Sequence, residues 1–288
     1  MQCNNFKKIG IFLKKGHESA INIGINIAKW LIKKDIEVLA EDEVSIKLNL
    51  ARFTKLEISK KCDLALVLGG DGTFLSVARL IIDREVPLIG INLGSLGFLT
   101  EVTLEEIYST LETIFAGNCV IDERMMLKAE IFRNNKKMNE YTVLNDVVIN
   151  KGALARIINI KTSINEKYLT TYRADGLIIA TPTGSTAYSL SAGGPIVDPD
   201  LNSIIITPIC PHTLTHRPIV LLGSDIIEVK VNSHDSDVLV TLDGQIGIPL
   251  KNEDVIKIKK SDRKTYILKH PNKDYFELLR NKLKWGII

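Results

Sequence analysis

The chain carries a glycine turn, Gly69-Gly70-Asp71-Gly72-Thr73, between a short apolar run and a longer stretch with helical spacing. The five residues before the turn, Leu64–Leu68, are all apolar and do not alternate, which is typical of a strand buried on both faces. After the turn, apolar side chains recur at helical intervals, at Phe74, Leu75, Val77, Ala78, Leu80 and Ile81. A strand, a glycine turn and a helix in this order indicate an α/β protein that binds ligands at the carboxyl edge of a parallel sheet.

The composition of this turn favours phosphate binding. Glycine lets the backbone approach a bound group closely, and a helix N-terminus offers N–H donors and the positive end of the helix dipole. We therefore expect phosphate at Gly69, Gly70, Gly72 and Thr73. Asp71 stands out, since a carboxylate beside phosphate is repulsive unless it binds a metal ion or accepts a proton. The alternative is a tight turn in which Asp71 caps the next helix.

Two familiar phosphate-binding motifs are absent. The chain contains no G-x-x-x-x-G-K-[ST] sequence, and no G-x-G-x-x-G sequence follows a predicted strand. A phosphate bound at the Asp71 turn would therefore be held by a different kind of loop.

The overall composition is that of a soluble globular protein, because 45% of the 288 residues are apolar and 25% are charged. The net charge of +3 is too small to indicate a nucleic acid or a membrane as partner. No apolar run reaches the about 18 residues of a transmembrane helix, and the first residues do not resemble a signal peptide. Four scattered cysteines without a C-x-x-C pair favour reduced thiols and a cytoplasmic location.

Strands and helices alternate through residue 117, which predicts a Rossmann-like α/β domain with a parallel sheet over residues 1–120. Strands are expected at residues 8–13, 36–40, 64–68 and 87–91, whereas residues 41–60 are polar and less regular. A second glycine turn follows at residues 92–99, and we expect the two turns to form one rim at the edge of the sheet. Thr103 and Glu106 form a capping-box pattern that predicts a helix from Thr103.

The pattern changes near Ile121, where short alternating segments replace the helices. They lie at residues 129–132, 141–149, 157–164, 176–180, 203–207, 219–222, 226–231, 238–242, 255–258 and 266–268. Closely spaced strands of this kind predict a β-sandwich domain over residues 121–271. One helix is expected inside it at residues 183–192, and a last helix within 272–288 is expected to pack back on the α/β domain.

Three further stretches carry polar residues that a fold alone does not require. Asn145-Asp146 interrupts a predicted strand, for which a β-bulge is the alternative explanation. Arg173-Ala174-Asp175-Gly176 leads into a buried strand, and a salt-bridged turn explains it as well as a ligand does. Residues 181–191 hold six Ser or Thr, more than one N-cap needs. They favour a hydroxyl-rich site for a polar ligand over a nucleophilic serine, because no G-x-S-x-G elbow occurs.

Together these stretches resemble the NAD kinase family. The resemblance rests on Gly69-Gly70-Asp71-Gly72-Thr73, Asn145-Asp146, Asp175-Gly176 and the Thr-Pro-Thr-Gly-Ser-Thr-Ala-Tyr-Ser run from Thr181, in this order over roughly residues 64–270. The last run is very specific, whereas the Gly-Gly-Asp-Gly turn alone is shared with diacylglycerol and sphingosine kinases. The resemblance implies a Rossmann-like domain joined to a β-sandwich. It also implies transfer of the γ-phosphate of ATP to the 2′-hydroxyl of the adenosine ribose of NAD, which gives NADP.

The resemblance also implies a role for individual residues. Asp71 would be the catalytic base, Gly72 would help to hold NAD beside it, and Asn145 and Asp146 would contact its adenosine part. The other implied NAD-binding positions are Arg156, Arg173, Asp175, Thr186, Ala187, Tyr188, Ser189, Leu190, Ser191 and Gln245. Arg173 stands where other patterns carry lysine or histidine, and Gly244 stands where some relatives carry serine. The family further implies a divalent cation, Mg²⁺ or Mn²⁺, supplied with ATP, and a homodimer or homotetramer.

The chemistry agrees with these assignments. Phosphoryl transfer needs mainly positioning and charge stabilisation from the protein. A ribose hydroxyl is a poor nucleophile near neutral pH, so a carboxylate within hydrogen-bond reach helps by accepting its proton. Asp71 suits this role better than metal ligation, because its own turn has no second carboxylate. We predict that the metal ion binds mainly through the ATP phosphates and that the protein has no metal site of its own.

Two alternatives to an NAD kinase remain at this point. A lipid kinase of the same broad superfamily would need an apolar cleft for a chain, where this sequence offers a hydroxyl-rich helix start. A catalytically silent dinucleotide-binding regulator would gain nothing from a carboxylate beside phosphate.

Overall fold

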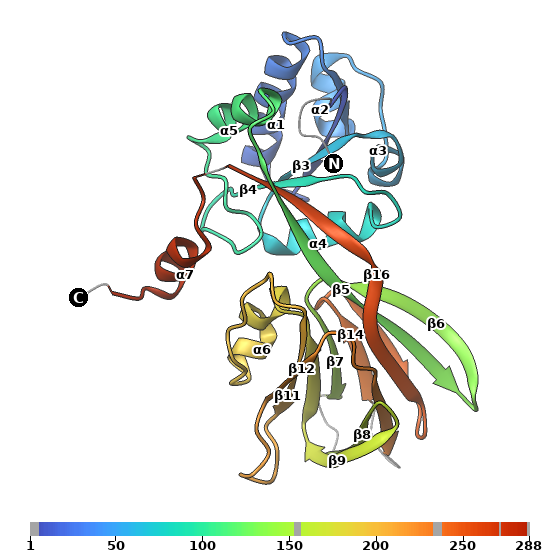
Figure 1. Cartoon of the computed structure of the whole chain (residues 1–288). Helices are drawn as coiled ribbons and strands as arrows, with labels where there is room; N and C mark the ends of the chain where they lie inside the picture. The colour runs from blue at the N-terminus through green and yellow to red at the C-terminus, as the bar shows by residue number, and fades with distance from the viewer. Residues whose placement is uncertain (1–5, 153–156, 233–237, 271, 287–288) are drawn as a thin grey trace. The chain divides into compact units, whose positions relative to one another are not determined.

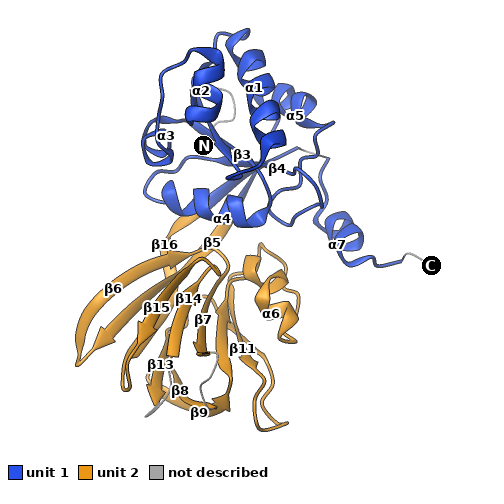
Figure 2. Cartoon of the chain, turned by 180° about the vertical axis from the view of Figure 1, so that it is seen from behind, with its two compact units in different colours: residues 1–123, 265–288 blue, residues 124–264 orange. Residues whose placement is uncertain are grey.

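A computed structural model describes residues 6–152, 157–232, 238–270 and 272–286 of the chain. The chain divides into two compact units (Figure 2): unit 1 is residues 1–123 with 265–288, and unit 2 is residues 124–264. The sequence-based domain boundaries lie at 120/121 and 271/272. In the structure, residues 265–271 group with unit 1.

The elements are labelled along the chain in Figure 1. Unit 1 contains β1 (Lys8–Leu13), α1 (Glu18–Ile32), β2 (Glu37–Ala40), α2 (Asp42–Leu48), α3 (Lys55–Lys61), β3 (Leu64–Leu68), α4 (Asp71–Leu80), β4 (Leu88–Ile91), α5 (Ile107–Phe115) and α7 (Tyr275–Leu283). Two long strands, β5 (Val120–Arg133) and β16 (Val255–Lys269), contribute residues to both units. Unit 2 contains β6 (Lys136–Val143), β7 (Asp146–Lys151), β8 (Ile158–Ile164), β9 (Lys167–Ala174), β10 (Gly176–Ala180), the 3₁₀ turn η1 (Thr183–Thr186), α6 (Tyr188–Ser191), β11 (Ser203–Ile209), β12 (Ile219–Leu222), β13 (Ile227–Asn232), β14 (Val238–Leu242) and β15 (Ile246–Leu250).

Unit 1 is built on a parallel sheet with the strand order β2, β1, β3, β4 and the end of β16. All five residues of β3 are buried, in agreement with its lack of alternation. Helix α1 buries an apolar face that includes Ala20, Ile27 and Leu31. The predicted α/β fold is confirmed for this unit. None of the helices in the described ranges is long and apolar enough to cross a membrane.

Two local expectations for unit 1 are wrong. The stretch 41–60, expected to be irregular, contains α2 and α3. These helices have seven residues each, which is too short for a helical period to stand out. A capping box of Thr54 and Glu57 begins α3. The helix expected from Thr103 begins at Ile107, although the Thr103 N–H does donate to the Glu106 carboxylate at 3.0 Å.

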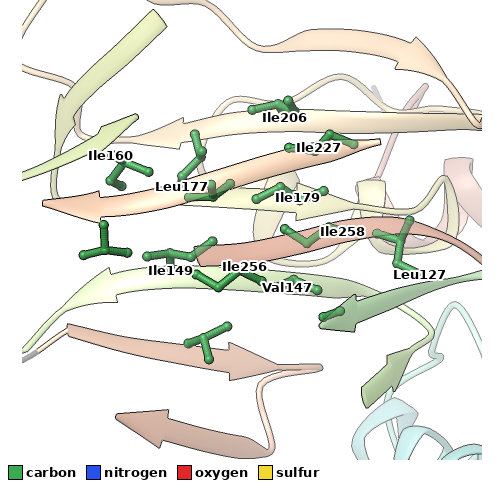
Figure 3. Close-up of a cluster of buried hydrophobic side chains, with 14 of the residues drawn as sticks. Leu127, Val147, Ile149, Ile160, Leu177, Ile179, Ile206, Ile227, Ile256 and Ile258 are labelled. Carbon is green, nitrogen blue, oxygen red and sulfur yellow. The ribbon is translucent and has the colours of Figure 1, made fainter. Parts of the chain in front are cut away.

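Unit 2 consists of two sheets with mainly antiparallel pairing. One has the strand order β12, β11, β10, β7, β14 and β15, and the other contains β16, β13, β8 and β9, with β5 paired to β16 and to β6. Buried side chains from both sheets pack together, among them Val147, Ile149, Ile160, Ile179 and Ile256 (Figure 3). The predicted β-sandwich is confirmed.

Several segments of unit 2 differ from expectation. The single strand expected at 141–149 is two strands, because β6 ends at Val143 and β7 begins at Asp146, so that Asn145 lies between strands. The strands expected at 255–258 and 266–268 are one strand of 15 residues, β16. The helix expected at 183–192 is divided into η1 and α6 at Ala187, whose ψ of −130° is not helical.

The expectation of reduced thiols holds for two cysteines of the described ranges. Cys62 is buried and Cys210 is exposed, and both are free. Cys119 is disulfide-bonded, so the expectation is wrong there.

Candidate active site

Asp71 is the first residue of α4, directly after β3 and the glycine turn. Its carboxylate does not cap the helix but binds the second glycine turn. Oδ2 accepts the N–H of Phe98 at 2.9 Å. Oδ1 accepts the N–H of Leu99 at 3.0 Å and both the N–H and the hydroxyl of Thr100 at 3.1 Å. The two glycine turns are therefore joined in one rim, as their places after neighbouring strands predicted.

The second turn is shaped to receive this carboxylate. A Cβ at Gly97 would lie 2.2 Å from Oδ1 of Asp71, so the close approach requires glycine. Asn92 is 5% exposed, accepts the N–H of Gly94 at 2.6 Å and donates to the carbonyl of Thr100 at 3.3 Å. A carboxylate has about four lone-pair directions, two on each oxygen, so Oδ1 is saturated by its three donors whereas Oδ2 has a single donor. A substrate hydroxyl could therefore donate to Oδ2 without replacing any of these donors.

The predicted phosphate-binding residues form the turn just before and after Asp71. Gly70 and Gly72 are exposed, Thr73 is half-buried and Gly69 is buried. A Cβ at Gly69 would lie 2.5 Å from the hydroxyl of Thr73, whereas a Cβ at Gly70 would meet no atom within 4 Å. Glycine is sterically required at the first position, and the second leaves open space above the turn. Phosphate binding at these residues stays a prediction.

Unit 2 contains a cavity of about 250 Å³ whose lining includes Asn145, Asp146, Asn150, Tyr188 and Asp243. The side-chain oxygens of Asn145 and Asn150 are buried and have no hydrogen-bond partner in the described part of the chain. Asp146 is 4% exposed. Its burial first, and the nearby Asp243 carboxylate second, raise the pKa of Asp146 to about 7. The cavity therefore presents polar oxygens that a bound ligand could satisfy.

The backbone of residues 144–146 is fixed from two directions. In the turn between β14 and β15, the Asp243 carboxylate accepts the N–H groups of Leu144, Asn145 and Asp146 at 3.1, 2.7 and 3.3 Å. After β10, the hydroxyl of Thr181 donates to the Leu144 carbonyl at 2.6 Å and its N–H donates to the Asn145 carbonyl at 2.9 Å.

Gly184 packs against the same segment. A Cβ at Gly184 would lie 2.1 Å from the Asn145 carbonyl oxygen, so the contact requires glycine. The Thr-Pro-Thr-Gly run thus shapes the cavity by holding the backbone of Asn145.

The other hydroxyls of this run bond mainly within the protein. Ser185 Oγ donates to the Val197 carbonyl at 3.2 Å and accepts the Val197 N–H at 3.0 Å. The hydroxyls of Ser189 and Thr207 lie 2.9 Å apart. Of the NAD-binding positions expected between Thr186 and Ser191, Ala187 and Tyr188 line the cavity, and Tyr188 is 44% exposed.

Three further expected positions, Arg173, Asp175 and Gln245, do not line this cavity. Arg173, near the end of β9, is exposed. Asp175 forms an ion pair with Lys151 at 2.9 Å, which is the salt-bridged turn considered as the alternative. Gln245 is exposed in the turn between β14 and β15. Arg156 lies outside the described residues. The NAD contacts of these four residues stay predictions.

Sequence reasoning missed Asp243. The local signal was the Asp-Gly pair of a hairpin turn, which identifies the turn but not the three N–H groups that the side chain accepts. Those groups lie 97 to 99 residues away in the sequence.

The acidic residues of the described ranges do not form a metal site. No group of three or more His, Cys, Asp or Glu side chains that could hold a metal ion occurs there. Asp71 is engaged by four donors, and Asp243 by three N–H groups. Where a divalent cation binds stays a prediction.

Comparisons with known proteins identify the family of both domains. Residues 9–119 match the ATP-NAD kinase N-terminal domain, and residues 144–270 match the ATP-NAD kinase C-terminal domain. The chain is 50% identical over 281 residues to the NAD kinase of Geotalea daltonii, with 97% of this chain and 99% of that protein covered. It is 51% identical over 280 residues to the NAD kinase of Geobacter metallireducens, with the same coverage.

Two solved structures have the same fold. Yeast NADH kinase complexed with NADH has a TM-score of 0.90 at 27% identity, and the match covers 98% of this chain and 89% of the yeast chain. An NAD kinase from Archaeoglobus fulgidus in complex with ATP has a TM-score of 0.76 at 24% identity, with 96% and 98% covered, and supports the fold alone. Since both domain matches and half-identical relatives extend over nearly the whole length, the chain belongs to the NAD kinase family.

Proposed function

We propose that this NAD kinase family member transfers the γ-phosphate of ATP to the 2′-hydroxyl of the adenosine ribose of NAD, with Asp71 as the base and the Asn145–Asp146 cavity as the adenosine site. Family membership makes the chain a phosphotransferase that acts on NAD with ATP. The related yeast enzyme was solved with NADH, which supports a dinucleotide as one of the two substrates.

The observation that carries the adenosine site is the set of polar oxygens in the cavity. The side-chain oxygens of Asn145 and Asn150 lack partners in the described ranges, and the Asp146 carboxylate is almost fully buried beside them. Buried acceptors without donors are costly, so a ligand that supplies N–H and O–H groups is stabilised there. The amino group of adenine and the hydroxyls of ribose are such donors. Tyr188 adds an aromatic side chain to the same lining.

Asp71 is proposed to accept the proton of the ribose hydroxyl as that oxygen attacks the γ-phosphorus. Three of the four groups that donate to Asp71 are backbone N–H groups fixed by the turn, and the fourth is the hydroxyl of Thr100. A side-chain hydroxyl can rotate to another acceptor, whereas the backbone groups cannot. A substrate hydroxyl would therefore donate to the second lone pair of Oδ2, or to Oδ1 in place of the Thr100 hydroxyl.

The divalent cation expected with ATP would lie mainly on the ATP phosphates and neutralise their charge there. The described residues provide no cluster of metal ligands of their own. The contribution of the chain is to hold the acceptor hydroxyl and to receive its proton.

A single assay tests the proposal. Purified protein is incubated with NAD, ATP and Mg²⁺, and NADP is measured through an NADP-specific dehydrogenase. NADP should form, and diacylglycerol or sphingosine in place of NAD should not be phosphorylated. Lipid phosphorylation without NADP would favour the lipid kinase, and NAD binding without turnover would favour the silent regulator.

A cytoplasmic homodimer or homotetramer is proposed along with this activity. The family resemblance supports the oligomer, and the free thiols of Cys62 and Cys210 support the location, whereas the disulfide-bonded Cys119 counts against it. Light scattering of the purified protein measures the subunit number directly.

A further inference from the structure

We propose that Asp243 is a positioning residue for NAD binding, whose carboxylate fixes the backbone of residues 144–146 beside the cavity. This inference rests on the proposed adenosine site, which it deepens by naming a residue that sets the affinity of that site.

Several hydrogen bonds join Asp243 to the backbone of residues 144–146. The Asp243 carboxylate accepts three consecutive N–H groups, from Leu144, Asn145 and Asp146, between 2.7 and 3.3 Å. In return, the Asp243 N–H donates to the Asp146 carbonyl at 3.0 Å. Asp243 is 6% exposed, so these bonds form out of contact with water. Consecutive N–H groups that converge on one anion make a nest, which fixes the backbone between β6 and β7.

The turn explains why an aspartate can reach this position. Asp243 and Gly244 have φ values of +49° and +63°, as the two central residues of a type I′ turn require. Aspartate tolerates the left-handed region better than most residues, and its short side chain stays near the backbone. Asparagine or glycine would make this turn as well, so the turn itself does not require the carboxylate.

The Asp243 carboxylate also affects the charge of the cavity. Among the described residues that line it, the titratable side chains are Asp146, Asp243 and Tyr188. The Asp243 carboxylate adds to the effect of burial and raises the pKa of Asp146 to about 7. The charge of Asp146 therefore changes near neutral pH. Ionised Asp146 accepts hydrogen bonds from ligand N–H and O–H groups better than its protonated form, so NAD affinity should increase as the pH rises through about 7.

The variant Asp243→Asn tests the positioning role and the charge effect. Asparagine has the same shape as aspartate and tolerates the left-handed turn. Its amide, however, places an N–H₂ group where a carboxylate oxygen accepted one of the three backbone N–H groups. We expect the KM for NAD to rise about ten- to a hundredfold, because a buried donor is left without an acceptor. The kcat at saturating NAD should stay within about threefold and the KM for ATP should not change.

The charge effect is read from the pH dependence. NAD affinity is measured by calorimetric titration between pH 5.5 and 9 for the wild-type chain and for Asp243→Asn. Without the Asp243 charge the pKa of Asp146 falls, so the inflection should move to lower pH. The loss of affinity relative to the wild type should then be smaller at pH 6 than at pH 8.

Two further variants separate position from charge. Thr181→Val removes the hydroxyl that donates to the Leu144 carbonyl but leaves all charges, so it should raise the KM for NAD and keep the wild-type inflection. Asp225→Asn is the matched control, since Asp225 also accepts a backbone N–H, from Leu222 at 3.1 Å, but does not line the cavity. It should change neither the KM nor the pH profile.

The outcomes distinguish this inference from the proposed function. If the wild-type chain makes NADP but Asp243→Asn keeps its KM for NAD and its pH profile, the role of Asp243 is refuted and the function stands. If Asp243→Asn does not fold, Thr181→Val decides, because an unchanged KM for NAD in that variant also refutes the proposal. If the wild-type chain neither binds NAD nor makes NADP, both the function and this inference fail.

Discussion

Replacing Asp71 with asparagine separates its two possible contributions, proton acceptance and attachment of the second glycine turn. Asparagine keeps one carbonyl oxygen, which can take the place of Oδ1 and its three donors. Its N–H₂ group then faces the N–H of Phe98, which loses its acceptor. A fully buried donor without an acceptor costs about 1–3 kcal/mol; because the Phe98 N–H is only partly buried, the free energy of unfolding should fall by about 1 kcal/mol. The loss of a base should lower kcat by about 10² to 10⁴, with NAD affinity within a few-fold of the wild type.

The comparison variant is Thr100→Val, which removes one donor to the carboxylate and keeps the carboxylate itself. Thr100 is fully buried, and valine has nearly the same shape. If Asp71 acts as the base, Thr100→Val should keep kcat within about tenfold of the wild type while it lowers the free energy of unfolding by about 1 kcal/mol.

Initial rates of NADP formation and denaturant unfolding of both variants give the answer. Near-normal turnover of Asp71→Asn would remove the base assignment. An equal loss of kcat in Thr100→Val would mean that the position of the loop, rather than proton acceptance, limits the rate.

Three further outcomes are expected. Asp146→Ala should weaken NAD binding about ten- to a hundredfold in calorimetric titration and change ATP affinity far less, since it removes a buried acceptor; unchanged NAD affinity would place the adenosine site elsewhere. The pKa of Asp146 is about 7 in the folded chain against the ordinary 3.8, so the folded chain binds more protons and its free energy of unfolding falls as the pH rises from about 4 to 7. This fall amounts to at most about 4 kcal/mol, and Asp146→Asn should abolish it. If the melting temperatures of the wild-type chain and of Asp146→Asn differ by the same amount at pH 4.5 and at pH 8, this prediction is wrong. Gly184→Ala should cost about 1–3 kcal/mol and raise the KM for NAD, because the new methyl group meets the Asn145 carbonyl, whereas the control Gly247→Ala, with open space around its Cβ, should be silent.

Local pattern predicted much of the fold because many elements are specified by their own residues. Strand β3 has no polar residue to alternate, and this alone indicates burial on both faces. Helices α2 and α3 were missed because seven residues give barely two turns of periodicity. The capping box at Thr54 and Glu57 was the available signal for α3.

The candidate site was predictable only where chemistry shows in the residue type. Asp71 is conspicuous as a carboxylate in an anion-binding turn, but its four donors come from residues 27 to 29 positions later, and no local pattern gives them. The hydroxyls of Ser185 and Ser189 were expected to face a ligand, yet they bond to Val197 and Thr207. Whether a hydroxyl faces a ligand or the protein depends on packing between distant segments, which a single sequence does not display.

The two-part composition of unit 1 has a consequence for how the chain is made. Ile267 of β16 pairs with Leu88 of β4, and Leu268 belongs to the same buried cluster as Ile9 and Leu66. A ribosome delivers these residues only after all of residues 124–264, so the Leu88 end of the β4 edge waits without its partner strand throughout that interval, whereas the other end is already paired with Val102. At about 5–20 residues per second, the 141 residues of unit 2 impose a delay of roughly 7–30 s. During that time the exposed edge is open to chaperones and to pairing with another nascent chain.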